Sequence, residues 1–319
     1  MKKLTQAQTN PFPYSDTNRR FHTYDYFLKK RYGGKCVKIA LDADMTCPNI
    51  DGSRGWGGCI YCSSDGSGSG LGGKMTLTEQ YEEGRRRISG KWDISRCIPY
   101  LQANTNTYAP IMRLKQIYRE LLELPDAVGI NIATRADCID RENAKLLADI
   151  SRQTDLTIEL GLQSVHDATA EVINRCHTFE EFLEGYSIIR EECPRALVCV
   201  HLINGLPGES LDMMIESARR VGEIGADQVK IHLLHVLRGT RLCEMYDAGE
   251  YEPMSLDEYA DSVVRQLEVI PPETVICRIT GDGTPDELVA PMWSRKKFVV
   301  ADAIDKLLYE RDSWQGKML

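Results

Sequence analysis

Short apolar segments alternate with amphipathic segments along most of the chain. The apolar segments are brief and rich in β-branched residues, which predicts β-strands. They cover residues 36–44, 98–103, 127–134, 156–162, 196–203 and 228–236. The segments between them have helical spacing, and Thr76 or Thr78 is a suitable N-cap for the first. They cover residues 78–92, 111–124, 141–152, 167–174, 179–192 and 211–224.

This alternation predicts an α/β protein built from parallel β/α units. No glycine fingerprint of a dinucleotide-binding fold follows the first strand, so we expect a partial (β/α)6 barrel of the TIM type. Functional residues of such barrels gather where the strands end. Polar and unusual residues follow all six predicted strands, at residues 47–62, 102–107, 134–137, 163–164, 204–209 and 238–240. We therefore expect the functional site at these strand ends.

Helical spacing and one candidate strand, residues 274–280, continue beyond residue 250. We interpret the last part of the chain as an extension that packs on the barrel. The predicted regions are an N-terminal arm at 1–38, the barrel at 39–250 and a C-terminal α/β extension at 251–319.

Composition is that of a soluble globular protein, with 42% hydrophobic residues, 27% charged residues and a mean hydropathy of −0.34. No apolar run approaches the roughly 20 residues that span a bilayer. The first ten residues are polar and lack the apolar core of a signal peptide. We therefore expect a cytoplasmic protein without a membrane partner.

The charge is uneven along the chain. The formal net charge is −8, yet residues 1–38 contain nine Lys/Arg, two Asp/Glu and several aromatic residues. Cations interleaved with aromatics suit a phosphate-bearing partner whose bases stack. The other interpretation is an arm that packs on the acidic remainder of the chain. A second basic run lies at residues 295–297.

Three of the eleven cysteines lie in one glycine-rich loop. In a reducing compartment, free thiols in the core and metal ligands are the expected uses of cysteine. Residues 47–62 read CPNIDGSRGWGGCIYC, a C-x11-C-x2-C spacing directly after the first predicted strand. Three thiolates on such a loop can bind three irons of a cubane and leave the fourth open. Zinc with Cys36 or a histidine as fourth ligand, or simple core cysteines, are the alternatives.

The cysteine loop resembles the CPNRDG…GGC-x-[FY]-C signature of the YhcC/YtqA group of radical S-adenosylmethionine (SAM) proteins, relatives of Elongator protein 3. The resemblance covers nearly the whole chain and is strongest to the YtqA/MnmL-like branch. Its further segments are NPFPYSDTNRRFHTYDYFLKKRYG from residue 10, QANTNTYAP at 102–110, IATRADC at 132–138, ELGLQSVHD at 159–167, INRCH at 173–177, HLINGLPGES at 201–210, KIHLLHVLRGT at 230–240 and RITGDG at 278–283.

The resemblance implies that Cys47, Cys59 and Cys62 ligate a catalytic [4Fe-4S] cluster whose fourth iron binds SAM. Further SAM contacts are implied beside the last ligand and after strands two, four and five. They are Tyr61, Gln102, Asn104, Glu159, Gln163, Ser164, Asn204, Gly205 and Leu206. The segment after strand two lacks the double glycine that relatives have there. His201 stands where many relatives have Asp, so we assign no role to His201. Cys97, Cys138 and Cys176 are candidates for a second cluster.

The resemblance also implies the chemistry. Reductive cleavage of SAM would yield a 5′-deoxyadenosyl radical, and the substrate would be a tRNA wobble uridine whose carboxymethylaminomethyl group becomes aminomethyl. The implied partners are the tRNA anticodon stem-loop, held by the arm and by residues 295–297, and a one-electron reductant such as flavodoxin or ferredoxin. The alternatives are a radical SAM enzyme acting on a small molecule or peptide, and a non-catalytic metal-binding module.

Overall fold

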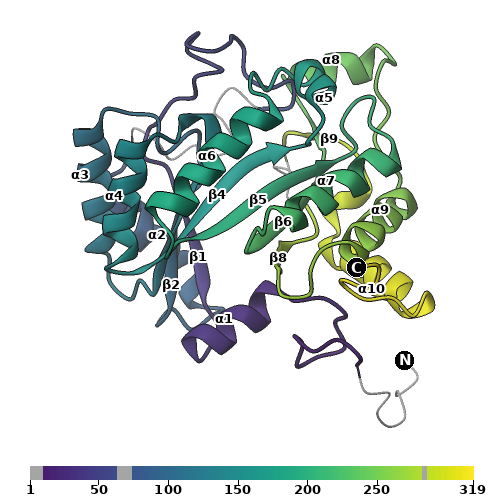
Figure 1. Cartoon of the computed structure of the whole chain (residues 1–319), viewed down its shortest axis with the longest axis horizontal. Coiled ribbons are helices and arrows are strands. Elements are labelled where there is room, and N and C mark those ends of the chain that lie inside the picture. Colours follow the sequence, from purple (N-terminus) through teal and green to yellow (C-terminus); the bar gives the residue numbers. More distant parts are fainter. Residues whose placement is uncertain (1–9, 63–73, 282–285) are drawn as a thin grey trace.

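A curved sheet of seven parallel strands forms the centre of the computed structural model, which describes residues 10–62, 74–281 and 286–319 (Figure 1). The strand order is β1-β2-β3-β4-β5-β6-β8, with β1 and β8 at the edges. The strands are β1 (Val37–Leu41), β2 (Cys97–Leu101), β3 (Gly129–Thr134), β4 (Asp155–Gln163), β5 (Leu197–Asn204), β6 (Gln228–Leu233) and β8 (Val275–Arg278). The sheet is therefore an open barrel, as predicted.

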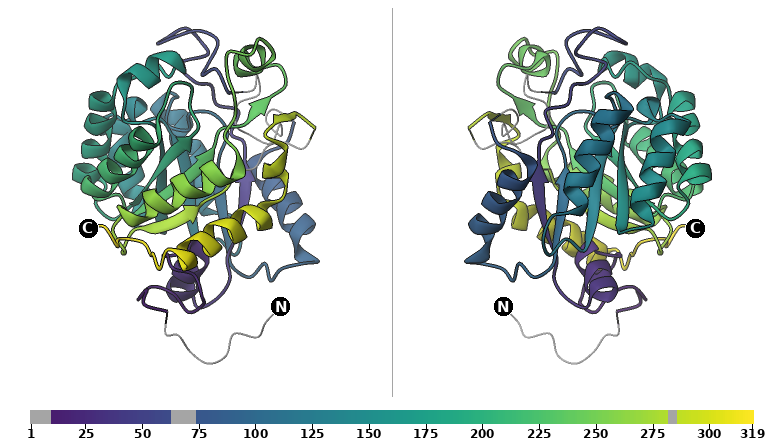
Figure 2. Two further views of the ribbon diagram at one scale, coloured as in Figure 1. Left: turned by 90° about the vertical axis from the view of Figure 1, so that its right-hand side faces the viewer. Right: turned by 90° about the vertical axis from the view of Figure 1, so that its left-hand side faces the viewer.

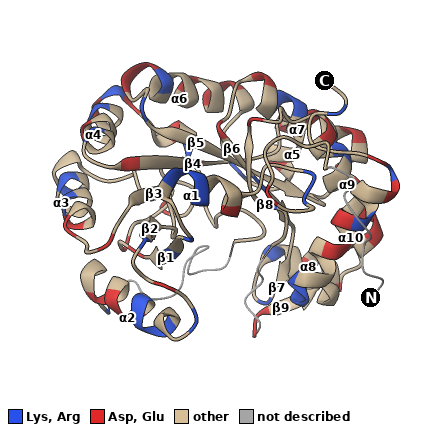
Figure 3. Cartoon of the chain, turned by 90° about the horizontal axis from the view of Figure 1, so that it is seen from below, with Lys and Arg blue, Asp and Glu red and all other residues tan. Residues whose placement is uncertain are grey.

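Most of the helices cover the outer face of this sheet (Figure 3). The helices of the described residues are α1 (Tyr24–Tyr32), α2 (Leu77–Ser89), α3 (Ile111–Leu122), α4 (Arg141–Ser151), α5 (Asp167–Val172), α6 (Phe179–Glu192), α7 (Leu211–Glu223), α8 (Arg241–Asp247), α9 (Leu256–Glu268) and α10 (Lys297–Glu310), with short 3-10 turns η1 (Ala136–Cys138) and η2 (Met292–Arg295). Of these, α1 lies across the end where the strands begin, and α8 lies beside β7 (Val236–Leu237) and β9 (Leu288–Ala290). Thr76, not Thr78, caps α2, and its side chain accepts from the Glu79 backbone N–H. Among the described residues, no helix is long and apolar enough to cross a bilayer.

The C-terminal region contributes the seventh strand. β8 coincides with the predicted strand 274–280 and pairs with β6 in parallel, so this part of the region lies within the barrel sheet. Its last helix, α10, packs along α9 (Figure 2). Residues 1–9 of the predicted arm and residues 282–283 of the RITGDG segment lie outside the described residues.

Several predicted elements end two or three residues earlier than expected, and two of them change the course of the chain. The strand predicted at 228–236 is wrong in its last three residues, because β6 ends at Leu233 and β7 (Val236–Leu237) pairs antiparallel with β9 (Leu288–Ala290). The chain leaves the sheet there because Leu234 and Val236 bury their side chains in a second apolar cluster. The helix predicted at 167–174 ends at Val172, and Asn174 takes a left-handed conformation with φ of 54°.

The described part of the N-terminal arm packs on the barrel. Helix α1 lies across the end of the sheet where the strands begin (Figure 3), with Leu28 against Cys36 and Ile98. Arg20 pairs with Asp312 at 2.9 Å, and Arg31 pairs at 2.6 Å with Asp155, the first residue of β4. This confirms the interpretation of the arm as packed on acidic residues. It also places Arg20 and Arg31 at the end of the barrel opposite the cysteine loop. The role of the arm in holding RNA stays a prediction.

Candidate iron–sulfur and SAM site

The cysteine loop leaves the end of β1 and folds back on itself through turns. Residues 47–62 contain turns, bends and a bridge between Asp51 and Trp56. Cys47, Cys59 and Cys62 are all half-buried free thiols. A Cβ at Gly55 would lie 2.3 Å from Asn49 Oδ1 and 2.6 Å from Cys176 Sγ, so a larger residue would have to displace these two side chains. The loop thus brings three thiols to one edge of the sheet in a close-packed backbone.

The INRCH segment between α5 and α6 holds this loop in place. Asn174 Nδ2 donates to the carbonyls of Trp56 at 3.0 Å and Gly58 at 2.7 Å, and the Ile60 N–H donates to Ile173 O at 3.1 Å. Asn49 Nδ2 donates to Asn174 O in return. The sequence provided these residues only as part of the resemblance, without a role. The signal available was an asparagine beyond a short helix, a residue type that tolerates φ > 0.

The thiols lie in a polarised environment. A hydrogen bond with Cys62 lowers the pKa of Cys59 to about 6, with burial opposing the shift and the positive charge of Arg135 adding to it. A lowered thiol pKa favours the thiolate, which is the metal-binding form. Arg135 is buried at the end of β3, where it makes a two-point ion pair with Asp137 at 2.8 and 2.9 Å and donates to Arg175 O at 2.9 Å. Arg135 is therefore held in place by a neighbouring carboxylate and a backbone carbonyl.

The donor set fits an iron–sulfur cubane better than zinc. A cubane needs one thiolate for each of three irons, whereas a zinc ion needs four ligands at one point. Cys36, the proposed fourth zinc ligand, is buried under α1 before β1 begins. The intervening strand has five residues, a length of roughly 16 Å at about 3.3 Å per residue. In residues 10–62, 74–281 and 286–319, no three His, Cys, Asp or Glu side chains surround one metal-sized point.

The three cysteines named for a second cluster do not lie together. Cys97 is fully buried in the main core and donates to Ile94 O at 3.2 Å. Cys138 and Cys176 instead flank the cysteine loop, where burial raises the pKa of each thiol and the negative charges of Asp137 and Cys47 add to the shift. The structure therefore separates Cys97 from the other two.

The residues predicted to contact SAM after β4 occupy two different levels of the barrel. Gln163 and Ser164 lie at the strand end, with Gln163 at φ of 64° and the Ser164 hydroxyl donating to Glu209. Arg175 braces this edge by donating to Ser164 O at 2.6 Å. The prediction that Glu159 ends its strand is wrong, because β4 continues to Gln163. Glu159 lies mid-strand, where its carboxylate is buried in ion pairs.

The turn after β5 is held by packing. The Asn204 amide donates to Ser262 Oγ at 3.0 Å and Gln266 Oε1 at 2.8 Å, so its side chain is bound to α9. Gly205 has φ of 85°, and Leu206 packs in the second apolar cluster with Ile60 of the cysteine loop. The Asn204 side chain therefore faces α9, and the contact of this turn with SAM stays a prediction.

The segment after β2 lies directly beside the residues that lead into the cysteine loop. The Gln102 N–H donates to Leu41 O at 3.2 Å, and Asn104 Nδ2 donates to Met45 O at 2.8 Å. Tyr61 packs beside the second apolar cluster, and burial together with Cys59 raises its pKa. The structure therefore brings Gln102, Asn104 and Tyr61 to the cysteine end of the barrel.

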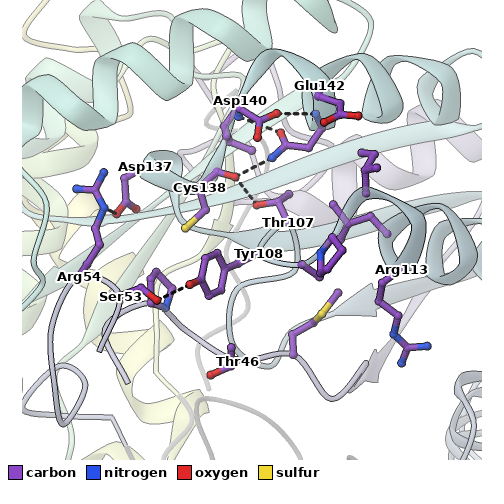
Figure 4. A pocket seen from close by; sticks show the side chains of 18 of the residues that line it. Thr46, Ser53, Arg54, Thr107, Tyr108, Arg113, Asp137, Cys138, Asp140 and Glu142 are labelled. Carbon is purple, nitrogen blue, oxygen red and sulfur yellow. Dashed lines mark hydrogen bonds and ion pairs between the residues drawn. The ribbon is translucent and has the colours of Figure 1, made fainter. Parts of the chain in front are cut away.

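A cavity of about 880 Å³ lies between the cysteine loop and the starts of α3 and α4 (Figure 4). Ser53 Oγ and Tyr108 Oη, 2.6 Å apart, join its two sides, and Arg54 reaches Asp137 at 3.3 Å. Its lining includes Thr46 and Pro48, on either side of Cys47, but none of the residues predicted to contact SAM. The cavity is thus a neighbour of the site on the outer side of the loop.

Comparisons with known proteins agree with this geometry. The profile of the Radical SAM superfamily matches residues 51–221, and that of the Radical_SAM C-terminal domain matches residues 226–310. The uncharacterized protein YtqA of Bacillus subtilis is 45% identical over 311 residues, 97% of this chain and 96% of YtqA. YhcC of Escherichia coli K12 is 31% identical over 284 residues, 89% of this chain and 90% of YhcC.

Among solved structures, an archaeal Elp3 from Methanocaldococcus infernus, lacking its N-terminus, has the same fold. Its TM-score is 0.65 at 16% identity, and the match covers 88% of this chain and 64% of that one. Proteins of the superfamily use a [4Fe-4S] cluster and SAM as cofactors, and both apply to this chain. The chain belongs to the radical SAM superfamily, in the group that contains YtqA and YhcC.

Proposed function

We propose that this radical SAM enzyme modifies the side chain of the tRNA wobble uridine and converts a carboxymethylaminomethyl group to aminomethyl. SAM would be the net two-electron oxidant of the carbon between nitrogen and carboxylate, and hydrolysis of the resulting imine would release the two-carbon fragment as glyoxylate. The observation that carries the catalytic part is the cysteine loop, with three half-buried thiols at the strand ends and a thiol pKa of about 6 at Cys59. Cys47, Cys59 and Cys62 would hold the cluster. When bound, the cluster and SAM supply a one-electron reductive cleavage that begins hydrogen abstraction from an unactivated carbon.

The protein itself would position the thiols, balance charge, orient SAM and limit the access of water. Asn174 and Ile173 keep the thiols at the sheet edge, and Arg135 offsets part of the negative charge of an iron–sulfur site. Gln163 and the backbone of Gly205 lie at strand ends suited to orienting SAM. The sheet and its outer helices enclose the reacting groups, which limits the access of water to a reactive intermediate.

The tRNA substrate is implied by the resemblance of the sequence to the YtqA/MnmL-like branch, and one surface supports it. Arg295, Lys296 and Lys297 are exposed beside Phe298, whose side chain is 87% exposed at the start of α10. This run follows β9, which lies at the same end of the barrel as the ends of β4 and β5 (Figure 1). Cations beside an exposed aromatic ring suit phosphate contacts and base stacking. These residues, rather than α1, would hold the anticodon stem-loop.

The test is anaerobic reconstitution with iron and sulfide, followed by dithionite and SAM. The wild type should carry about four irons per chain and release 5′-deoxyadenosine, and each of Cys47→Ala, Cys59→Ala and Cys62→Ala should lose both. Cys36→Ala is the matched control, since that thiol is buried at the far end of β1, and it should keep its iron.

Substrate assignment uses anticodon stem-loops analysed by nucleoside mass spectrometry. Appearance of aminomethyl-uridine with one 5′-deoxyadenosine per turnover supports the proposal. Release of 5′-deoxyadenosine without any change in RNA would favour a small-molecule or peptide substrate. A zinc-bound protein that leaves SAM intact would refute the catalytic part and favour a binding module.

A further inference from the structure

The inner face of the curved sheet carries a row of ionisable and polar side chains, here called the inner belt: Lys38, Asn131, Glu159, His201 and Lys230. Glu159 lies at its centre. Lys38 Nζ donates to Glu159 Oε1 at 2.9 Å, and Asn131 Nδ2 donates to the same oxygen at 2.7 Å. His201 Nε2 lies 2.9 Å from Glu159 Oε2, and Lys230 Nζ donates to that oxygen as well. Four strands besides β4 thus converge on one carboxylate.

The inner belt presents donors, not its carboxylate, to the inside of the barrel. The Glu159 side chain is 0% exposed, whereas the Lys38 side chain is 22% exposed and that of His201 17%. The two lysine ammonium groups of the inner belt face the single carboxylate of Glu159, so a net positive charge remains. The Lys38 ammonium also lies 4.6 Å from the ring centre of Tyr24, which closes the belt from below on α1. A group that reaches the inner belt from the cysteine end therefore meets positive charge.

On three of the five strands of the inner belt, small residues occupy the next level toward the cysteine loop, whereas β5 and β6 carry Ile203 and His232 there. Side chains two positions apart on a strand share a face, about 6.6 Å apart. One such step above the belt lie Ala40 on β1, Ala133 on β3 and Gly161 on β4. Gly161 is partly exposed although β4 is the central strand of the sheet and helices cover the outer face, and Ala40 on the edge strand β1 is partly exposed as well. Solvent therefore reaches the inner face between the inner belt and Gln163 at the rim.

A neighbouring polar atom lacks a partner. His232 Nε2 is buried and makes no hydrogen bond to any described residue. Its ring lies 5.2 Å from that of His201, centre to centre. A buried donor or acceptor without a partner costs roughly 1–3 kcal/mol, and such atoms are usually satisfied by a water molecule or a ligand.

We propose that the inner belt recognises an anionic group of the substrate, with Lys38 as its main contact. Because the belt lies below the level of small residues, an anion bound there directs the rest of the substrate toward the rim, where SAM binds. The inference rests on the proposed function, in which this anion is the carboxylate of the carboxymethylaminomethyl group. Glu159 then acts as a positioning residue that fixes Lys38 and Lys230.

The test compares a carboxylate with its neutral ester. Anticodon stem-loops carrying 5-carboxymethylaminomethyl-uridine or its methyl ester are assayed for kcat/KM with the wild type and with Lys38→Met. The wild type should prefer the acid about 10- to 100-fold, as expected for the loss of a charged hydrogen bond, and Lys38→Met should lose this preference. Arg31→Met removes an exposed cation of α1, outside the barrel interior, and should keep it.

A second measurement is independent of catalysis. The free nucleoside 5-carboxymethylaminomethyluridine, its methyl ester and inorganic phosphate are titrated into iron-free protein by calorimetry. Stronger binding of the acid than of the ester supports a carboxylate site, and binding of phosphate alone would reassign the belt to a phosphate and overturn the carboxylate form of the inference. If Lys38→Met does not fold, Lys38→Met/Glu159→Gln, which removes both charges of that pair, replaces it.

The outcomes separate the two claims. A wild type that releases no 5′-deoxyadenosine refutes the proposed function and leaves the calorimetry to decide on the belt. A wild type that releases it but treats acid and ester alike in both assays overturns the belt inference alone. Retention of the acid preference by Lys38→Met or its replacement overturns it as well.

Discussion

Gly185 of α6 lies directly against the peptide group of Ala136 in η1, and this contact makes a sharp prediction about stability. A Cβ at Gly185 would lie 2.0 Å from Ala136 O and 2.7 Å from Ala136 C. Both are backbone atoms, so rotation of a side chain cannot relieve the overlap. Gly185→Ala must therefore separate α6 from the turn that carries Asp137.

The size of the effect follows from this geometry. A carbon–oxygen contact of about 3.3 Å requires a displacement of roughly 1.3 Å, and overpacking of this kind costs about 1–3 kcal/mol. We take the upper value because both sides are backbone. Alanine regains about 1 kcal/mol of helix propensity over glycine, which leaves a net loss of about 2 kcal/mol. For 319 residues this lowers the melting temperature by about 3 °C.

Differential scanning calorimetry of the iron-free protein measures this difference. Gly90→Ala is the matched control, because Gly90 ends α2 with φ of −73° and a Cβ at this position would have no atom within 4 Å. Its melting temperature should change by less than about 1 °C, since the new methyl group meets open space. Equal melting temperatures for the two variants would refute the steric argument.

Three further predictions concern charge. Arg135→Met should lower the midpoint potential of the cluster by roughly 50 mV in an EPR-monitored redox titration, because the cation stabilises the more negative reduced state; an unchanged or higher potential would contradict this. Burial, reinforced by Arg175 and then Arg135, lowers the pKa of His177 to about 2 from 6.5. Below about pH 6.5 the unfolded chain therefore binds a proton at His177 that the folded chain excludes, so the free energy of unfolding falls as the pH falls through that value. In urea unfolding, His177→Gln should remove about 1 kcal/mol of the stability lost between pH 7.5 and 5.5. If the wild type and the variant lost the same stability over this range, His177 would not be its cause. The double substitution Arg19→Gln/Arg20→Gln should lower the melting temperature by about a degree or two, through loss of surface ion pairs. It should leave tRNA affinity unchanged in filter binding, and weakened binding would support the role of the arm in holding RNA.

The alternation of apolar and amphipathic segments predicted the strands well because buried parallel strands are short apolar runs separated by helices. Strands β1 to β6 follow one another in both sequence and space. The strand at 274–280 was predicted as an element, but its place beside β6 was not. That pairing skips β7, α8 and α9, so the regular alternation that orders β1 to β6 does not extend to it. The sequence offered both Thr76 and Thr78 as the N-cap of α2. In the structure Thr76 is the cap, because its side chain and that of Glu79 each bond the backbone N–H of the other residue.

The sequence predicted those parts of the candidate site whose residues are close together along the chain. It did not predict the contacts between residues that are far apart along the chain. Three cysteines in one loop are visible in the sequence. The contacts of Asn174 with that loop join residues 118 and 116 positions apart and depend on a left-handed residue in a short connection. Glu159 shows a different limit. Strands of a barrel covered by helices are buried on both faces, so alternation alone does not tell that its side chain points inward.

The bracing of the cysteine loop by Asn174 has a consequence for biogenesis. A ribosome adding about 5–20 residues per second needs roughly ten seconds to pass from the loop to its brace. During that interval the nascent thiols have no fixed arrangement and are open to oxidants and to stray metal ions. Insertion of the cluster in the cell is accordingly a late event that follows synthesis of the first half of the barrel, and a delivery factor that acts on the emerging chain has to recognise the loop before it has a shape.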